Sequence, residues 1–128
     1  MILNFLKGFR VNGKRKETDF ENKIKSGRKV HTIRRDEKDR WCIGRKIHFS
    51  TGSRTNNYNC FKHGVCTGIQ YIDIFDRTIF VDNYRLSEIN IEELAINDGF
   101  NDVDDFWAWF DQYSPFDGKI IHWTNKRY

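Results

Sequence analysis

The segment SGRKVHTIRRD, residues 26–36, joins a glycine turn to β-branched residues and a run of cationic side chains. Gly27 is expected to end a helix, and Val30 and Thr32 favour a strand over Lys29–Arg34. A half-buried strand alternates apolar and polar side chains, and here nearly all the polar ones are cations. The segment is therefore either an edge strand protected by charge or an anion-binding groove with a lysine and a hydroxyl at its centre.

The length and composition of the chain favour one small domain. A chain of 128 residues predicts a single domain over residues 1–128, and aromatic residues, 16% of the total, are expected to form much of its core. An odd number of cysteines, three, argues against a disulfide framework and for a reducing compartment. No apolar run approaches the ~18 residues of a membrane span, and the N-terminal one is too short for a signal peptide. We therefore expect a cytoplasmic protein without membrane contact.

The charges are strongly segregated along the chain. Residues 1–54 hold 16 lysines and arginines against six acids, whereas residues 86–118 hold nine acids and no lysine or arginine. The basic half is suited to facing phosphates. The acidic segment 86–118 is expected either to lie away from them, to place a carboxylate in a basic cleft, or to contact a protein partner.

Most of the chain has the character of short strands. The basic, glycine-containing residues 7–16 are expected to form a mobile loop. Thr18 is expected to cap a helix over Asp19–Ser26, with Glu21 as its capping-box partner. Strands are predicted over residues 2–6, 29–34, 45–50, 66–75, 78–81 and 119–123.

Two helices are predicted in the acidic part of the chain. They cover Ser87–Asn97 and Asp102–Tyr113, and Asp102 is expected to cap the second. Trp107 lies off the main apolar stripe and is predicted to be a surface or cleft aromatic. Short strands with two or three helices indicate an α+β arrangement, a small β-barrel covered on one side by helices.

Three sequence blocks resemble the ASCH domain family. They are GRKVHTIR at residues 27–34, CTGI at residues 66–69, and the pair LAINDGF and DFWAWF at residues 94–100 and 105–110. The likeness spans roughly residues 1–125. It implies a PUA-like fold, a small β-barrel with two or three helices flanking a basic cleft, and a general role in RNA or nucleotide recognition.

One departure from the family pattern points to a particular subgroup. Thr32 stands where the family usually has a glutamate, and this is similar to small bacterial ASCH proteins that hydrolyse N4-acetylcytidine. That likeness implies Lys29 as base, Thr32 as nucleophile and, in place of a glutamate, Asp98 as acid. A threonine hydroxyl needs such an activating base. Residues 29 and 32 of a regular strand point to opposite faces, so Lys29 must lie on the turn or the strand must bulge.

The first functional hypothesis is an RNA- or nucleotide-binding module that needs no cofactor. Its phosphates are expected to meet cationic side chains, and a base to stack on an aromatic ring. The alternatives are the amidohydrolase and a ribonuclease with His31 as an acid–base group. The residues predicted to contact nucleic acid are Arg28, His31, Arg34, Arg35 and Arg45, together with Lys29 in the cleft.

Three possible zinc ligands lie close together in the sequence. They are Cys60, His63 and Cys66, but their spacing is not that of a zinc knuckle or ribbon. A hairpin with incidental cysteines is favoured, and no metal is expected.

Overall fold

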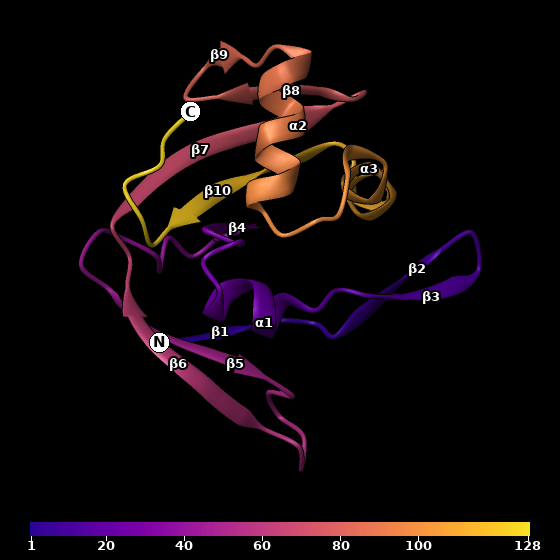
Figure 1. Cartoon of the computed structure of the whole chain (residues 1–128). Helices are drawn as coiled ribbons and strands as arrows, with labels where there is room; N and C mark the ends of the chain where they lie inside the picture. Colours follow the sequence, from indigo (N-terminus) through magenta and orange to yellow (C-terminus); the bar gives the residue numbers. More distant parts are fainter.

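The chain folds as an α+β domain rich in strands, which confirms the predicted class. A computed structural model describes all residues, 1–128 (Figure 1). The strands are β1 (Ile2–Asn4), β2 (Gly8–Val11), β3 (Lys14–Glu17), β4 (His31–Arg34), β5 (Lys46–Thr51), β6 (Asn59–Val65), β7 (Gly68–Phe75), β8 (Thr78–Val81), β9 (Tyr84–Arg85) and β10 (Phe116–His122). The helices are α1 (Phe20–Lys25), α2 (Glu88–Asn97) and α3 (Val103–Phe110), and a 3-10 turn, η1, follows over Asp111–Tyr113.

A five-stranded antiparallel sheet forms the larger part of the molecule. Its order is β4-β10-β7-β8-β9, and β4 pairs with β10 so that Thr32 lies opposite Ile121. Four consecutive residues of β10, Lys119–His122, are buried, as expected for a strand covered on both faces. In Figure 1, α2 crosses this sheet and brings its C-terminal end towards β4.

A second sheet has the order β1-β5-β6, with β1 parallel to β5. The main chain passes from this sheet into the larger one between β6 and β7. A hydrogen bond joins β4 and β1, which are edge strands of the two sheets: Arg34 Nη2 donates to the carbonyl oxygen of Asn4 at 2.6 Å. None of the sheets closes on itself, since each has two distinct edge strands, so the predicted β-barrel is not confirmed.

Aromatic rings form the centre of the core, as the composition predicts. Phe100 packs edge-on against Phe20 and Phe106, with ring centroids 5.8 and 5.6 Å apart. Trp107 is buried as well, packed against Phe106, so its prediction as a surface or cleft aromatic was wrong. Trp109, two residues later, is the tryptophan of this helix that reaches a cleft.

The capping prediction was right for Asp102 and wrong for Thr18, and Ser87 caps α2 in addition. Ser87 and Asp102 accept hydrogen bonds from backbone amides in the first turns of α2 and α3. Thr18 instead donates to the carbonyl oxygen of Leu6 at 2.7 Å. Asp19 occupies the cap position, and its side chain accepts from Asn22 Nδ2 and not from a backbone amide of the helix. Residues 7–16, predicted to be a loop, mostly belong to the β2–β3 hairpin.

Part of the segregated charge is paired inside the molecule. Five of the acids in residues 86–118 form ion pairs with cations from other parts of the chain, which brings the basic and acidic segments together. The pairs are Lys126–Glu93, Lys29–Asp98, Lys16–Asp105, Arg77–Asp111 and Arg35–Asp117. None of the helices is long and apolar enough to cross a membrane.

Gly99 allows the end of α2 to approach Lys29. Its φ of +98° is unfavourable for side chains, and a Cβ there would lie 2.9 Å from Lys29 Cδ and 3.0 Å from the Phe20 ring. Gly99→Ala should therefore lower the free energy of unfolding by about 1–3 kcal/mol, measured by urea denaturation. Gly44→Ala is the matched control, because Gly44 has a similar φ of +91° but open space around it. Equal losses in the two variants would contradict close packing at Gly99.

Candidate functional site

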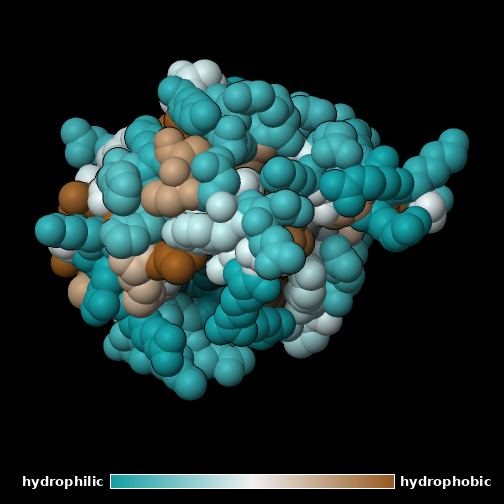
Figure 2. Space-filling model, turned by 90° about the horizontal axis from the view of Figure 1, so that it is seen from below, coloured by the Kyte–Doolittle hydropathy of each residue, from teal (hydrophilic) through white to brown (hydrophobic).

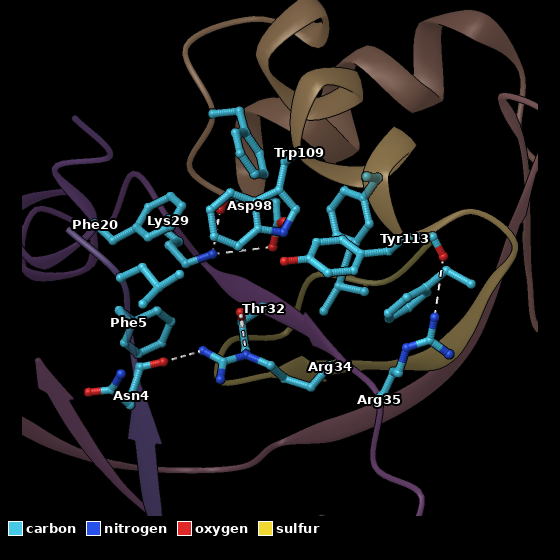
Figure 3. A pocket seen from close by; sticks show the side chains of 15 residues that line it. Asn4, Phe5, Phe20, Lys29, Thr32, Arg34, Arg35, Asp98, Trp109 and Tyr113 are labelled. Atoms are coloured by element: carbon cyan, nitrogen blue, oxygen red, sulfur yellow. Dashed lines mark hydrogen bonds and ion pairs between the residues drawn. The ribbon is translucent and has the colours of Figure 1, made fainter. Parts of the chain in front are cut away.

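A pocket of about 240 Å³ lies where the two larger sheets and the helices meet (Figure 3). The segment after β1 and the start of α1 border it on one side, and β4, α3 and η1 on the other. Nearly half of its lining residues are aromatic, and its polar groups come mainly from residues 29–35. The lining residues are Asn4, Phe5, Leu6, Phe20, Lys29, Thr32, Ile33, Arg34, Arg35, Asp98, Phe100, Trp109, Phe110, Tyr113 and Phe116.

Lys29 lies in the pocket wall, just before β4 begins. Its ammonium group donates to the carbonyl oxygen of Asp98 and contacts Asp98 Oδ1 at 3.2 Å. The Phe20 ring lies 4.6 Å away, and the side chain is only 1% exposed. Burial lowers the pKa of Lys29 to about 8, although the Asp98 carboxylate partly opposes this shift. Because Lys29 precedes the strand, it lines the same pocket as Thr32 without a bulge.

Two further cations hold the C-terminal end of α2. Arg28 donates to the carbonyl oxygens of Ile96 and Phe100, and Lys23 Nζ donates to that of Gly99 at 2.7 Å. Carbonyls at a helix C-terminus lack intrahelical partners and carry the negative end of the helix dipole, so cations are favourable there. Arg28 was predicted to contact nucleic acid, but it does not line the pocket. Its guanidinium instead connects the turn at residues 27–29 to the end of α2.

A series of hydrogen bonds among residues that do not line the pocket ends at Asp98. Asn97 Nδ2 donates to Tyr128 Oη at 3.0 Å, and Tyr128 Oη lies 2.6 Å from His31 Nε2. Because a carboxylate only accepts, His31 Nδ1 carries the proton and donates to Asp98 Oδ1 at 3.2 Å, and in the neutral ring Nε2 accepts from Tyr128 Oη. Burial lowers the pKa of His31 and favours this neutral form. His31 therefore orients Asp98 and does not line the pocket itself.

Arg34 is the cation of the pocket without a carboxylate partner. Its Nε donates to Thr32 Oγ1 at 3.4 Å, its Nη2 donates to Asn4, and the Phe5 ring lies 5.1 Å from Cζ. Burial lowers the pKa of Arg34 to about 10, which still leaves the guanidinium charged at neutral pH. Thr32 and Arg34 lie on the same face of β4, as residues two apart in a strand must.

Arg35 and Arg45 have different surroundings. Arg35 lines the pocket, its side chain is 42% exposed, and its guanidinium lies 4.7 Å from the Phe116 ring. Arg45 is exposed just before β5 and does not line the pocket. The structure thus brings together Lys29, Thr32, Arg34, Arg35 and Asp98 of the predicted site residues, and it leaves Arg28, His31 and Arg45 outside.

The three possible zinc ligands, Cys60, His63 and Cys66, do not converge. Cys60 Sγ lies 3.8 Å from His63 Nε2, but Cys66 is buried and its thiol contacts the carbonyl oxygen of Gly68. His48 lies opposite His63 on the neighbouring strand, and the two rings pack edge to face. No group of three or more such side chains has a metal-binding arrangement.

Sequence reasoning missed several residues of the site. Trp109 and Phe100 were recognised as members of family-like blocks or of an apolar stripe, not as pocket walls. Tyr113 was placed only at the end of a helix, and Asn4 only in a strand. Tyr128 carried no signal, because its contact with His31 joins residues 97 positions apart.

The pocket can bind a planar ligand by chemistry that is visible in its wall. Aromatic rings offer stacking surfaces, Arg34 offers hydrogen-bond donors, and Thr32 can donate or accept. Asp98 offers a second carboxylate oxygen, Oδ2, to which no protein group donates. No hydrogen bond joins Lys29 to Thr32.

The depressed pKa of Lys29 makes stability depend on pH. Between its folded pKa of about 8 and the ordinary value of 10.5, the unfolded chain binds more protons than the folded chain. The free energy of unfolding contributed by Lys29 should therefore rise with pH across this window. Relative to Lys29→Met, the unmodified chain should gain about 2 kcal/mol between pH 8 and pH 10 in urea denaturation.

If the difference in free energy of unfolding between the unmodified chain and Lys29→Met does not change between pH 8 and pH 10, the burial of Lys29 is contradicted. If Lys29→Met fails to fold, the NMR chemical shift of Lys29 Cε provides the same test. Its titration midpoint should then lie near 8.

The comparisons with known proteins add no relatives. No family model, curated protein or solved structure matches the chain.

Proposed function

We propose that the chain is an ASCH-type domain of PUA-like fold that binds RNA or a nucleotide by accepting one base in the pocket. The family-like sequence blocks support this proposal, because several of them meet at this place. GRKVHTIR provides Lys29, Thr32 and Arg34, LAINDGF provides Asp98 and Phe100, and DFWAWF provides Trp109 and Phe110.

The aromatic wall is suited to stacking a base. Trp109 is half-buried and packs against Phe9 and Phe100, with ring centroids 5.2 and 5.9 Å apart, so its orientation is fixed by neighbours. Tyr113 is 44% exposed at the same pocket. Nucleobases stack on such rings whatever their hydrogen-bonding pattern, with about 1–3 kcal/mol per base.

The observation that carries the proposal is Arg34. Arg34 is only partly buried and has no carboxylate partner, so its remaining N–H groups are open to acceptors of a ligand that enters the pocket. Arg34 is held by the carbonyl oxygen of Asn4 and by Thr32, and its Nη1 makes no hydrogen bond within the protein. Carbonyl and ring-nitrogen acceptors of a base, or a phosphate oxygen, satisfy such a group.

Asp98 and Arg35 complement Arg34. The free Asp98 Oδ2 accepts hydrogen bonds, so a ligand with an N–H or amino group on the same edge as its acceptors fits the pocket. Arg35 is partly exposed and suits a phosphate outside the wall. The volume of about 240 Å³ lies slightly below the range of drug-sized sites and matches one base or nucleoside better than a folded oligonucleotide.

Calorimetric titration with the four ribonucleoside 5′-monophosphates tests this function. The unmodified chain should bind at least one of them, and Arg34→Met should weaken that binding about 10–100-fold through loss of charged hydrogen bonds. Arg40→Met is the matched control, since Arg40 is exposed and does not line the pocket. Trp109→Leu provides a second test of the wall if Arg34→Met is unstable. Binding that neither variant weakens would refute the pocket as the nucleotide site.

An amidohydrolase is the second candidate, favoured by one specific observation. Lys29, Thr32 and Asp98 line one pocket, and the pKa of Lys29 of about 8 leaves roughly a tenth of its amine neutral at pH 7. Thr32 Oγ1 would add to the carbonyl carbon of an N-acyl group while Lys29 takes the hydroxyl proton. The C–N bond then breaks, the amine leaves with a proton that Asp98 receives from the adjacent Lys29 ammonium group, and water hydrolyses the resulting ester. The missing Lys29–Thr32 hydrogen bond makes binding the better-supported function.

Turnover of N4-acetylcytidine distinguishes the two candidates. Chromatography should show cytidine release by the unmodified chain and none by Lys29→Ala or Thr32→Val if the amidohydrolase chemistry operates, because either change removes a reacting group. Release that persists in both variants would show a different mechanism or a contaminant. No release by the folded, nucleotide-binding chain would leave the binding function alone.

The other predictions have weaker support. Both ring nitrogens of His31 are engaged and its side chain is fully buried, so it is not placed to transfer protons in a ribonuclease. A cytoplasmic location, and a protein partner for the acidic segment 86–118, stay predictions.

A further inference from the structure

The β2–β3 hairpin extends from the body of the protein as a two-stranded ribbon (Figure 1). Asn12 and Gly13, with φ of 51° and 76°, connect the strands and have the positive values that a type I′ turn requires. In Figure 2 the extension is almost entirely hydrophilic. The side chains of the ribbon are partly or fully exposed, so they are available for contacts with another molecule.

The cations of this ribbon lie on neighbouring strands. Arg10 is directly opposite Arg15, but the Arg10 guanidinium is directed towards Gly13 at the tip and the Arg15 guanidinium towards Gly8 and Glu17 at the base. Arg15 has one acid nearby, Glu17, at 2.9 Å, in a pair that is mostly exposed to water. Arg10 makes only a hydrogen bond to the carbonyl oxygen of Gly13. Lys14 is exposed near the tip, so the ribbon carries more positive charge than its own contacts neutralise.

The base of the ribbon is fixed beside the pocket. Phe9 of β2 packs edge-on against Trp109 and Phe100, and both of these line the pocket. From β3, Lys16 forms an ion pair with Asp105 of α3 at 2.6 Å. The direction of the hairpin relative to the pocket is therefore set by packing and by an ion pair.

We propose that the β2–β3 hairpin is a backbone-binding arm that holds the phosphates of an RNA strand whose base occupies the pocket. This inference rests on the proposed function and specifies its ligand as a polynucleotide. Arg10, Lys14 and Arg15 contact phosphate oxygens, which supply the negative charge that the ribbon largely lacks. Such contacts carry no sequence information and position the strand, while the pocket reads one base.

The test compares a short single-stranded RNA with the mononucleotide that binds the pocket. The variant Arg10→Gln/Arg15→Gln removes the opposed charges and keeps polar side chains of similar length. The control Arg40→Gln/Arg85→Gln removes the same charge from exposed positions outside the hairpin. Circular dichroism establishes that all three proteins are folded. Affinity is measured by fluorescence anisotropy between about 50 and 200 mM salt.

The hairpin variant should bind the RNA at least about tenfold more weakly at low salt, with mononucleotide affinity unchanged. The slope of log affinity against log salt should become shallower by about 1.4, the value for two lost contacts with a single strand. The control should keep the slope of the unmodified chain. An unchanged slope in the hairpin variant, or an equal change in the control, would overturn the proposal.

The two ligands separate failure of the arm from failure of the pocket. Mononucleotide binding with no tighter binding of RNA would overturn the arm and leave the pocket function intact. RNA binding that depends on the hairpin, without mononucleotide binding, would support the arm and refute the pocket. Binding of neither ligand would refute both.

Discussion

The buried contact between Lys29 and Asp98 is the interaction on which the arrangement of the site depends. It joins the turn before β4 to the C-terminal end of α2, two segments far apart in the sequence. A buried ion pair contributes little net stability, because removing both charges from water costs about as much as their attraction returns. Its main effect is geometric, since any other position of α2 would leave a buried charge unpaired.

The surrounding contacts reinforce this geometry. Lys23 and Arg28 donate to the carbonyl oxygens of Gly99 and Phe100 just after α2, and Gly99 lacks the side chain that would keep Lys29 away. His31 holds Asp98 from the opposite side. With α2 fixed, the chain that follows it brings Phe100 and α3 over the pocket. The result is a small wall of aromatic rings around charged groups whose positions are set from outside the pocket.

The sequence predicted the elements with strong periodicity and clear caps. The helices after Ser87 and Asp102, and the strands around β4, β5, β7, β8 and β10, lie close to their predicted ranges. The β2–β3 hairpin was missed although Asn12-Gly13 is a hairpin signal, because the flanking strands are mostly charged and show no apolar alternation. Trp107 was assigned to the wrong environment, since the apolar stripe of α3 does not reveal which side faces a cleft.

Only the part of the site that is formed by residues close together in the sequence was predictable. Thr32, Arg34 and Arg35 share one strand or its end, and Lys29 lies just before it, so one motif located four members of the pocket. Spacing does not distinguish a cation that faces a ligand, such as Arg34, from one that holds a helix end, such as Arg28. The contact of His31 with Tyr128 depends on the path of the whole chain, and no local pattern contains it.

The most direct measurement is a ¹⁵N NMR titration that follows the tryptophan indole N–H signals as a nucleoside 5′-monophosphate is added. A base in the pocket should shift the Trp109 signal saturably, while Trp41, buried outside the pocket wall, should not move. The absence of a saturable change at Trp109, or a change at Trp41 alone, would contradict the assignment of this pocket as a nucleotide site.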